Sequence, residues 1–170
     1  MIRVIGGALL LCGSILSGWI AAGRLDARVG TIRQMLAAIQ TIRRELAFSL
    51  TSVPCMIERL ETQTKGPLHL FFNRFQTALH QLGTKSMGEL WNETLQKTEL
   101  PIQPEERNLF ATLGEVLGRY DGEGQETYFS FLTEELERCQ RAAEEERNRM
   151  GKVYRVLGVT VGGFLIVLLF

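Results

Sequence analysis

Residues that could support catalysis or metal binding are few in this chain and do not converge on one point. The two histidines, His69 and His80, fall on one predicted helix about three turns apart, too far for both to bind one ion. Residues 144–146 are all glutamates, and consecutive side chains of a helix point around its cylinder rather than at one cation. No motif groups a serine, a histidine and an aspartate. The sequence therefore predicts neither an enzyme nor a metal site.

The glycines and cysteines give no stronger signal. Four glycines recur at Gly114, Gly118, Gly122 and Gly124. They follow no predicted strand, so we expect helix contacts and turns rather than a phosphate-binding loop, and we predict no cofactor. The three cysteines are Cys12, Cys55 and Cys139. No CxxC or Cys/His spacing joins them, which favours a reducing compartment and a role as small hydrophobic side chains.

Charge is confined to the middle of the chain. The 170 residues include 19 Lys and Arg and 19 Asp and Glu, for a formal net charge of +0. Arg3 alone precedes Arg24, and no charged residue follows Arg155. Because the two signs are nearly balanced in the middle, we expect no binding of nucleic acid. The order apolar, charged, apolar instead predicts a domain between two membrane segments.

The first apolar segment covers residues 4–22. If these roughly 19 residues form a helix, it would span about 28 Å, close to the hydrocarbon thickness of a bilayer. It could be a retained anchor, or a cleaved signal peptide that begins at Arg3 and ends at the small residues Ala21 and Ala22. The run is long and helical residues follow it without a break, which favours an anchor over residues 1–23.

The last apolar segment, residues 156–170, is shorter. It would span about 22 Å as a helix, less than a full crossing. Lys152, Tyr154 and Arg155 can reach back to the lipid headgroups and extend it. Residues 153–170 are therefore expected either to cross the membrane or to insert partway into it.

Basic residues next to these segments predict the topology. They are Arg24, Arg28 and Arg33 after the first segment, and Arg147, Arg149, Lys152 and Arg155 before the last. Both groups flank the same region, so the positive-inside rule places residues 24–152 in the cytoplasm and both ends toward the far side.

Small residues recur at a spacing of four in both apolar segments. They are Ser14, Gly18, Ala22, Gly158 and Gly162. This spacing lets helices approach closely in lipid, within one chain or between subunits. Glycine is also common in membrane helices without such contacts, so both interpretations remain.

The middle region reads as helices joined by short breaks. The first runs out of the membrane to about Leu50, on a seven-residue repeat of Val29, Ile32, Leu36, Ile39, Leu46 and Leu50. Signals for the shorter helices are a start at Ser52 and Pro54, a break at Gly66–Pro67, an end at Gly83, a capping box at Ser86 and Glu89, a linker over residues 100–104 and an end at Asp121–Gly122. These elements predict an all-α protein with about six helices.

Apolar stripes mark the expected core of these helices. They are Leu68, Phe72, Phe75, Leu79 and Leu82 in one helix, Leu109, Leu113, Val116 and Tyr120 in another, and Phe129, Leu132, Leu136, Cys139, Ala143 and Met150 in the last. The last helix begins near Glu123, and pairs such as Glu134 with Arg138 support it. Phe71 and Phe72 are adjacent, so we expect them either to face two neighbouring helices or to leave one ring on a partner surface.

Four stretches together resemble a known family along the whole chain. They are MIRVIGG at residues 1–7; Ile39-Gln40, Ile42, Glu45-Leu46 and Phe48 followed by Pro54; Leu113-Gly114, Leu117-Gly118, Asp121 and Gln125; and YRVLGV at residues 154–159 with Gly162-Gly163. In this order and at this length they are similar to the stage III sporulation protein AB family of spore-forming Firmicutes. The resemblance implies an antiparallel six-helix bundle, flanked here by N- and C-terminal transmembrane helices. Such a bundle resembles one cytoplasmic domain of the inner-membrane platform proteins of type II secretion and type IV pilus machines.

The resemblance also implies a function. It suggests a non-enzymatic platform in the mother cell's outer forespore membrane, beside a secretion-type ATPase and the ring proteins of a channel to the forespore. The larger platform proteins have two such domains and this chain has one, which leaves open whether it transmits ATPase motion. Candidate partner-binding residues on the glycine-rich turn and the charged last helix are Gly118, Asp121, Gln125, Glu134, Arg138 and Arg141. The alternatives are a membrane-anchored scaffold or signalling protein without a channel role, and a secreted helical protein.

Overall fold

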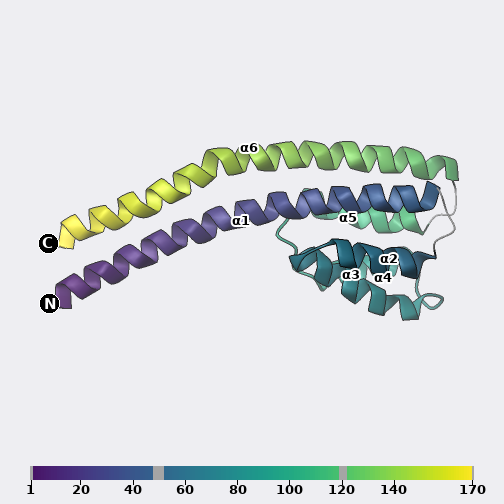
Figure 1. Ribbon diagram of the computed structural model, residues 1–170, viewed down its shortest axis with the longest axis horizontal. Coiled ribbons are helices and arrows are strands. Elements are labelled where there is room, and N and C mark those ends of the chain that lie inside the picture. The colour runs from purple at the N-terminus through teal and green to yellow at the C-terminus, as the bar shows by residue number, and fades with distance from the viewer. Residues whose placement is uncertain (1, 48–51, 119–121, 170) are drawn as a thin grey trace. The chain divides into compact units, whose positions relative to one another are not determined.

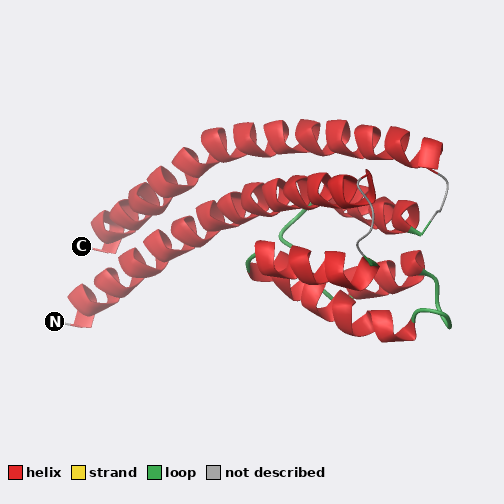
Figure 2. Cartoon of the chain, turned by 45° about the vertical axis from the view of Figure 1, so that its right-hand side comes forward, coloured by secondary structure: helices red, strands yellow, loops and turns green. Residues whose placement is uncertain are grey.

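The computed structural model describes residues 2–47, 52–118 and 122–169, and across these ranges every regular element is a helix (Figures 1 and 2). The elements are α1 (Ile2–Ala47), α2 (Val53–Gln63), α3 (Gly66–Ala78), the short 3₁₀ helix η1 (Leu79–Gln81), α4 (Met87–Gln96), α5 (Pro104–Leu117) and α6 (Gly122–Leu169). The prediction of an all-α chain with about six helices is confirmed for the described residues.

The chain divides into two compact units. The terminal unit comprises residues 1–29 and 141–170, and the central unit comprises residues 30–140. In the terminal unit, the first part of α1 and the last part of α6 run antiparallel and side by side (Figures 1 and 2). The central unit contains the other helices together with the remaining parts of α1 and α6.

Local signals start the helices of the central unit where the sequence predicts. Ser86 caps α4: its Oγ accepts from the amide of Glu89 at 3.2 Å, and Glu89 Oε2 accepts from the amide of Ser86 at 2.7 Å. The same reciprocal arrangement begins α5, where the amide of Gln103 donates to the buried carboxylate of Glu106 at 2.5 Å. Each box satisfies amides that lack a partner within their own helix.

The region after α3 follows its prediction only in part. Gly83 has a φ of 110°, a conformation that favours glycine, and lies just beyond η1 as the stop signal indicates. Leu82, predicted as part of the buried stripe, is exposed. The reason is geometric: the chain leaves the helical path at η1, so the spacing of three and four no longer places Leu82 on the core face.

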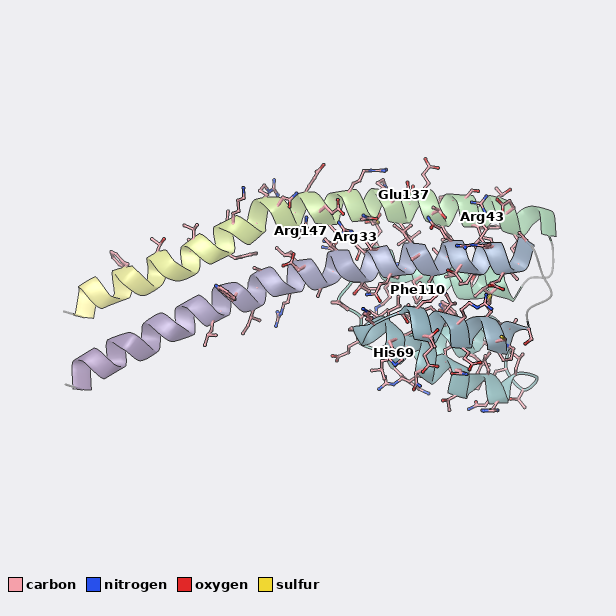
Figure 3. All side chains as sticks on the ribbon, in the orientation of Figure 1. Arg33, Arg43, His69, Phe110, Glu137 and Arg147 are labelled. Atoms are coloured by element: carbon pink, nitrogen blue, oxygen red, sulfur yellow. The ribbon has the colours of Figure 1, made fainter. Side chains whose placement is uncertain are left out.

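Five aromatic side chains cluster in the core of the central unit. Phe71, Phe72, Phe75, Trp91 and Phe110 are all fully buried, and the Trp91 ring lies 4.8 Å, 4.9 Å and 5.0 Å from those of Phe71, Phe75 and Phe110. Phe110, which lies on α5, is labelled in Figure 3. The idea that Phe71 or Phe72 lies on a partner surface is therefore wrong. Two adjacent positions on α3 can both be buried because α3 is covered from two sides, by α2 and by α4.

The contact between α4 and α5 is close because Gly114 faces Trp91. A Cβ on Gly114 would lie 2.3 Å from Trp91 Cγ, and a Cβ on Gly118 would lie 3.4 Å from Met87 Cβ. The missing side chain lets the indole approach α5, where Trp91 Nε1 donates to the carbonyl of Phe110 at 2.7 Å. The prediction that Gly114 and Gly118 serve helix contacts is confirmed. Phe110, absent from the predicted stripe, is a core residue in place of the half-buried Leu109.

Two arginines complete the carboxyl end of α4. Arg74 of α3 donates to the carbonyl of Lys97 at 2.5 Å, and Arg107 of α5 donates to the carbonyl of Leu95 at 2.9 Å. Carbonyls in the last turn of a helix lack partners within it and carry partial negative charge. Positive side chains from the neighbouring helices therefore join α3, α4 and α5 at this end.

Candidate functional site

Two ion pairs connect α1 and α6 in the terminal unit. Arg28 Nη1 lies 2.5 Å from Glu146 Oε2, and Arg147 Nε lies 3.9 Å from Asp26 Oδ1. The Arg28 side chain is only 12% exposed, whereas Asp26 is exposed. Figure 3 places Arg147 on α6. Since each helix supplies one acid and one base, these pairs specify which turns of α1 and α6 face each other.

The basic residues predicted to set the topology differ in their surroundings. Arg28 and Arg147 are paired, as above, and Arg33 lies exposed on the part of α1 that belongs to the central unit. The side chain of Arg155 lies outside the described residues. The remaining three are exposed and form no ion pair with any described residue: Arg24, Arg149 and Lys152. Some of these basic residues are thus paired with acids and others are not, and the effect of all of them on topology stays a prediction.

The small residues predicted to pack in the membrane are described only in part. Ala22 is buried and Gly18 is half-buried in the terminal unit. The surroundings of Ser14, Gly158 and Gly162 lie outside the described residues. Gly151, which the small-residue pattern does not include, is also buried, although a Cβ there would meet no heavy atom within 4 Å. Close packing through small residues stays a prediction.

Large apolar side chains are exposed along the terminal unit. They are Leu16, Trp19 and Ile20 on α1, and Val153, Tyr154, Val156, Leu157 and Phe164 on α6. Contiguous apolar exposure of this kind marks a surface that contacts protein or lipid. Within the described residues, none of the helices combines the length and the mean hydropathy that a membrane crossing needs.

In the predicted partner-binding turn, Gly118 and Gln125 lie at the end of α5. Gly118 is the residue that ends α5, and Gln125 donates to the carbonyl of Val116 in the last turn of that helix at 3.2 Å. Asp121 lies outside the described residues. The described residues of the turn therefore help to end α5, and their part in binding another protein stays a prediction.

Arg138 on α6 joins two helices of the central unit. It donates to Glu135 on its own helix at 2.8 Å and to Glu105 on α5 at 2.6 Å, instead of to Glu134, its predicted partner. These two carboxylates, Glu135 foremost, raise the pKa of Arg138. Glu134 is exposed on the same helix, and Arg141, also exposed, belongs to the terminal unit. Arg138, Glu105 and Glu135 thus form a group of mixed charge in the central unit, and the part of all these residues in binding a partner stays a prediction.

The cysteines and histidines behave as structural residues where they are described. Burial raises the pKa of Cys139, so its thiol stays protonated near neutral pH and is a weak nucleophile. Cys55 is exposed. His69 lies on α3 with Nδ1 2.9 Å from the carbonyl of Glu61 (Figure 3), and His80 lies on η1. Within the described residues, no group of three histidine, cysteine or acidic side chains could hold a metal ion.

Sequence reasoning missed three residues of the terminal unit. Asp26 and Glu146 supply the acids of the two ion pairs, and Trp19 is exposed near the end of the first apolar segment. For Trp19 a signal was present, because a tryptophan near the end of an apolar segment is typical of a membrane interface. Which acid meets which base became visible only in the folded chain.

Comparison with known proteins identifies the family. The family model for stage III sporulation protein AB matches residues 3–170. The stage III sporulation protein AB of Bacillus subtilis (strain 168) is 25% identical over 171 residues, which cover 99% of each chain. A solved structure of a stage III sporulation protein AB is 25% identical, with a TM-score of 0.67 over 72% of this chain and 98% of that one. The chain therefore belongs to the stage III sporulation protein AB family, which implies a role in sporulation.

Proposed function

We propose that this protein is a non-enzymatic, membrane-anchored platform in a sporulation channel complex, with the central unit in the mother-cell cytoplasm. The observation that carries the proposal is the row of exposed apolar side chains on both helices of the terminal unit. These side chains lie within the two apolar segments or, for Val153 and Tyr154, just before the last one. Exposed apolar side chains are unfavourable in water, and they are favourable in the hydrocarbon of a bilayer.

The central unit is the part proposed to dock a secretion-type ATPase. Its aromatic core and its capped helices make it a rigid support. Its α6 surface offers mixed charge at Arg138 and, on the same helix, two exposed aromatic side chains, Tyr128 and Phe131. Aromatic and arginine side chains are the types enriched where proteins bind one another.

Membrane extraction tests the anchor. Full-length protein expressed in cells should remain with the membrane in alkaline carbonate and dissolve in detergent. Protease added outside sealed cells should leave the central unit intact, and protease added after lysis should cleave it. Release by carbonate, or cleavage in sealed cells, would contradict the proposal.

Co-purification tests the ATPase. Full-length protein in detergent should retain the sporulation ATPase, and the triple variant Tyr128→Ser, Phe131→Ser and Arg138→Glu should lose about tenfold or more in affinity, the effect of one interface hot spot. A matched control changes three exposed residues elsewhere in the central unit: Leu70→Ser, Leu82→Ser and Lys65→Glu. Equal loss in both variants, or no retention by the wild type, would count against docking at this surface.

A further inference from the structure

The ion pairs show which residues of α1 and α6 lie at the same position along the axis of the helix pair in the terminal unit. Asp26 faces Arg147, so α1 and α6 are in antiparallel register at that turn. Trp19 precedes Asp26 by seven residues, and Tyr154 follows Arg147 by seven. At about 1.5 Å per residue, both aromatic side chains lie about 10 Å beyond the ion pair. Trp19 and Tyr154 are therefore at the same level, on neighbouring helices.

This level separates two kinds of surface. Trp19 is 69% exposed and Tyr154 38% exposed. Beyond them, toward the chain ends, the large side chains that are described as exposed are apolar, among them Leu16 and Leu157, and the exposed polar ones, Ser17 and Thr160, are small and uncharged. Tryptophan and tyrosine combine an apolar ring with a polar group, and they concentrate where hydrocarbon meets the lipid headgroups. Their position marks the boundary at which both helices would enter a bilayer.

Basic side chains lie just on the other side of this boundary. Arg24 is five residues from Trp19, and Arg149 is five residues from Tyr154, or about 7.5 Å along each helix. Lys152 lies between Arg149 and Tyr154. The headgroup layer of one leaflet is about 5–8 Å thick, so these three side chains fall within it.

The three basic side chains are also free of ion pairs with the described residues, so they can bind a ligand. All three are exposed, and none forms an ion pair with a described residue. Arg28 and Arg147, which lie four residues beyond Arg24 and two residues beyond Arg149 on the side away from the boundary, are paired with acids. A guanidinium group donates two parallel hydrogen bonds to a phosphate, and an ammonium group adds a compact positive charge.

We propose that Arg24, Arg149 and Lys152 form a binding site for the phosphate headgroups of anionic phospholipids, with Trp19 and Tyr154 at the hydrocarbon boundary. The site rests on the proposed membrane anchor and goes further: it names the lipid class and the residues that select it. Each basic residue at a membrane surface favours anionic lipid by about fivefold, so anionic lipid is enriched around these helices relative to the bulk bilayer.

The two tryptophans of the chain permit a direct test. Trp19 is exposed in the terminal unit, whereas Trp91 is fully buried in the aromatic core. Full-length protein is reconstituted in bilayers of phosphatidylcholine and phosphatidylglycerol, with brominated acyl chains on one lipid at a time. Bromine quenches nearby indole fluorescence, so the quenched part of the emission reports lipid beside Trp19, and the unquenched Trp91 emission reports that the central unit is folded.

The wild-type protein should be quenched more strongly by brominated phosphatidylglycerol than by brominated phosphatidylcholine at equal mole fraction. An enrichment of about fivefold is expected at low salt, and it should fall as salt screens the charges. The triple variant Arg24→Gln, Arg149→Gln and Lys152→Gln should be quenched equally by both lipids. The matched control Arg44→Gln, Lys65→Gln and Lys97→Gln removes the same charge from exposed side chains of the central unit and should keep the enrichment.

Other outcomes would overturn either the lipid site or the membrane anchor. Equal quenching of the wild type by both lipids would overturn the lipid site and leave the anchor intact. Loss of enrichment in the control variant as well would also overturn it, because net charge rather than these residues would then select the lipid. An absence of quenching by either lipid would overturn the membrane anchor itself.

Discussion

The α4–α5 pair and the α1–α6 pair of the terminal unit are both antiparallel, yet they are held together by different interactions. In the first, Trp91 fills the space left open by Gly114 and is shielded completely from solvent. In the second, Arg28 and Asp26 reach across to acid and base on α6 while large apolar side chains point outward. Shape decides the fit of one pair, and charge decides the register of the other.

The difference follows from what surrounds each pair. Where aromatic rings exclude water, the gain comes from close packing, and small changes in volume are felt. Where large apolar side chains are exposed on a helix pair rather than buried in it, hydrophobic burial cannot select one register over another. Directional polar contacts then do so. Four substitutions sharpen this comparison.

The largest effect is expected for Trp91→Ala. The change removes a fully buried indole from the aromatic core and leaves the Phe110 carbonyl without its second donor. The free energy of unfolding of the central unit should fall by about 3–5 kcal/mol. Denaturant unfolding of the full-length protein in detergent, followed by circular dichroism, measures it. Trp19→Ala is the control: its side chain is exposed, and an equal loss there would remove the basis of the comparison.

Gly114→Ala should destabilise the central unit by about 1–3 kcal/mol, because its Cβ would lie 2.3 Å from Trp91 Cγ and the indole must shift. Gly30→Ala provides the opposite case, since a Cβ at Gly30 meets no heavy atom within 4 Å. Alanine is the better helix former, so this variant should gain about 0.5–1 kcal/mol. Thermal unfolding of both variants gives the signs. If both moved in the same direction, close packing at Gly114 would not explain the contact.

Reversal of one charge in the terminal unit should have a smaller effect. Arg28→Glu places an acid against Glu146 and should weaken the helix pair by roughly 1–2 kcal/mol, between the values for exposed and buried ion pairs. The double variant Arg28→Glu and Glu146→Arg should recover it. Disulfide formation between cysteines introduced at the buried residues Ala22 and Gly151, with Cys55→Ser, reports the pairing. Crosslinking unaffected by the single reversal would show that charge does not set the register.

The smallest expected effect is a change in melting temperature that depends on pH, caused by the capping box at Glu89. Hydrogen bonds from Ser86 lower the pKa of Glu89 below its ordinary value of 4.5. A lowered pKa means that the carboxylate stabilises the folded state above pH 4.5 and that this contribution disappears as the pH falls through the folded-state value. The melting temperature of Glu89→Gln should therefore be slightly below that of the wild type at neutral pH and should converge with it in acid. A constant difference across this range would exclude the ionised capping box as its cause.

The sequence predicted well wherever one local signal decides the outcome. Ser86 with Glu89 begins α4, Pro54 lies in the first turn of α2, and Gly83 follows η1, because capping and backbone preference depend on neighbours in the chain. It predicted poorly where two helices decide together. Phe110 is a core residue because Trp91 and Phe71 lie opposite it, and no spacing on its own helix indicates this.

The sequence by itself determined the family, the helical class and the confinement of charge to the middle of the chain, because composition and short-range periodicity are properties of neighbouring residues. Only the tertiary structure decided that Asp26 faces Arg147, that Gly114 faces Trp91 and that Arg24 stays unpaired among the described residues. The reason is physical: each of these depends on which turns of two helices meet, and that register is chosen by packing and charge across the folded chain.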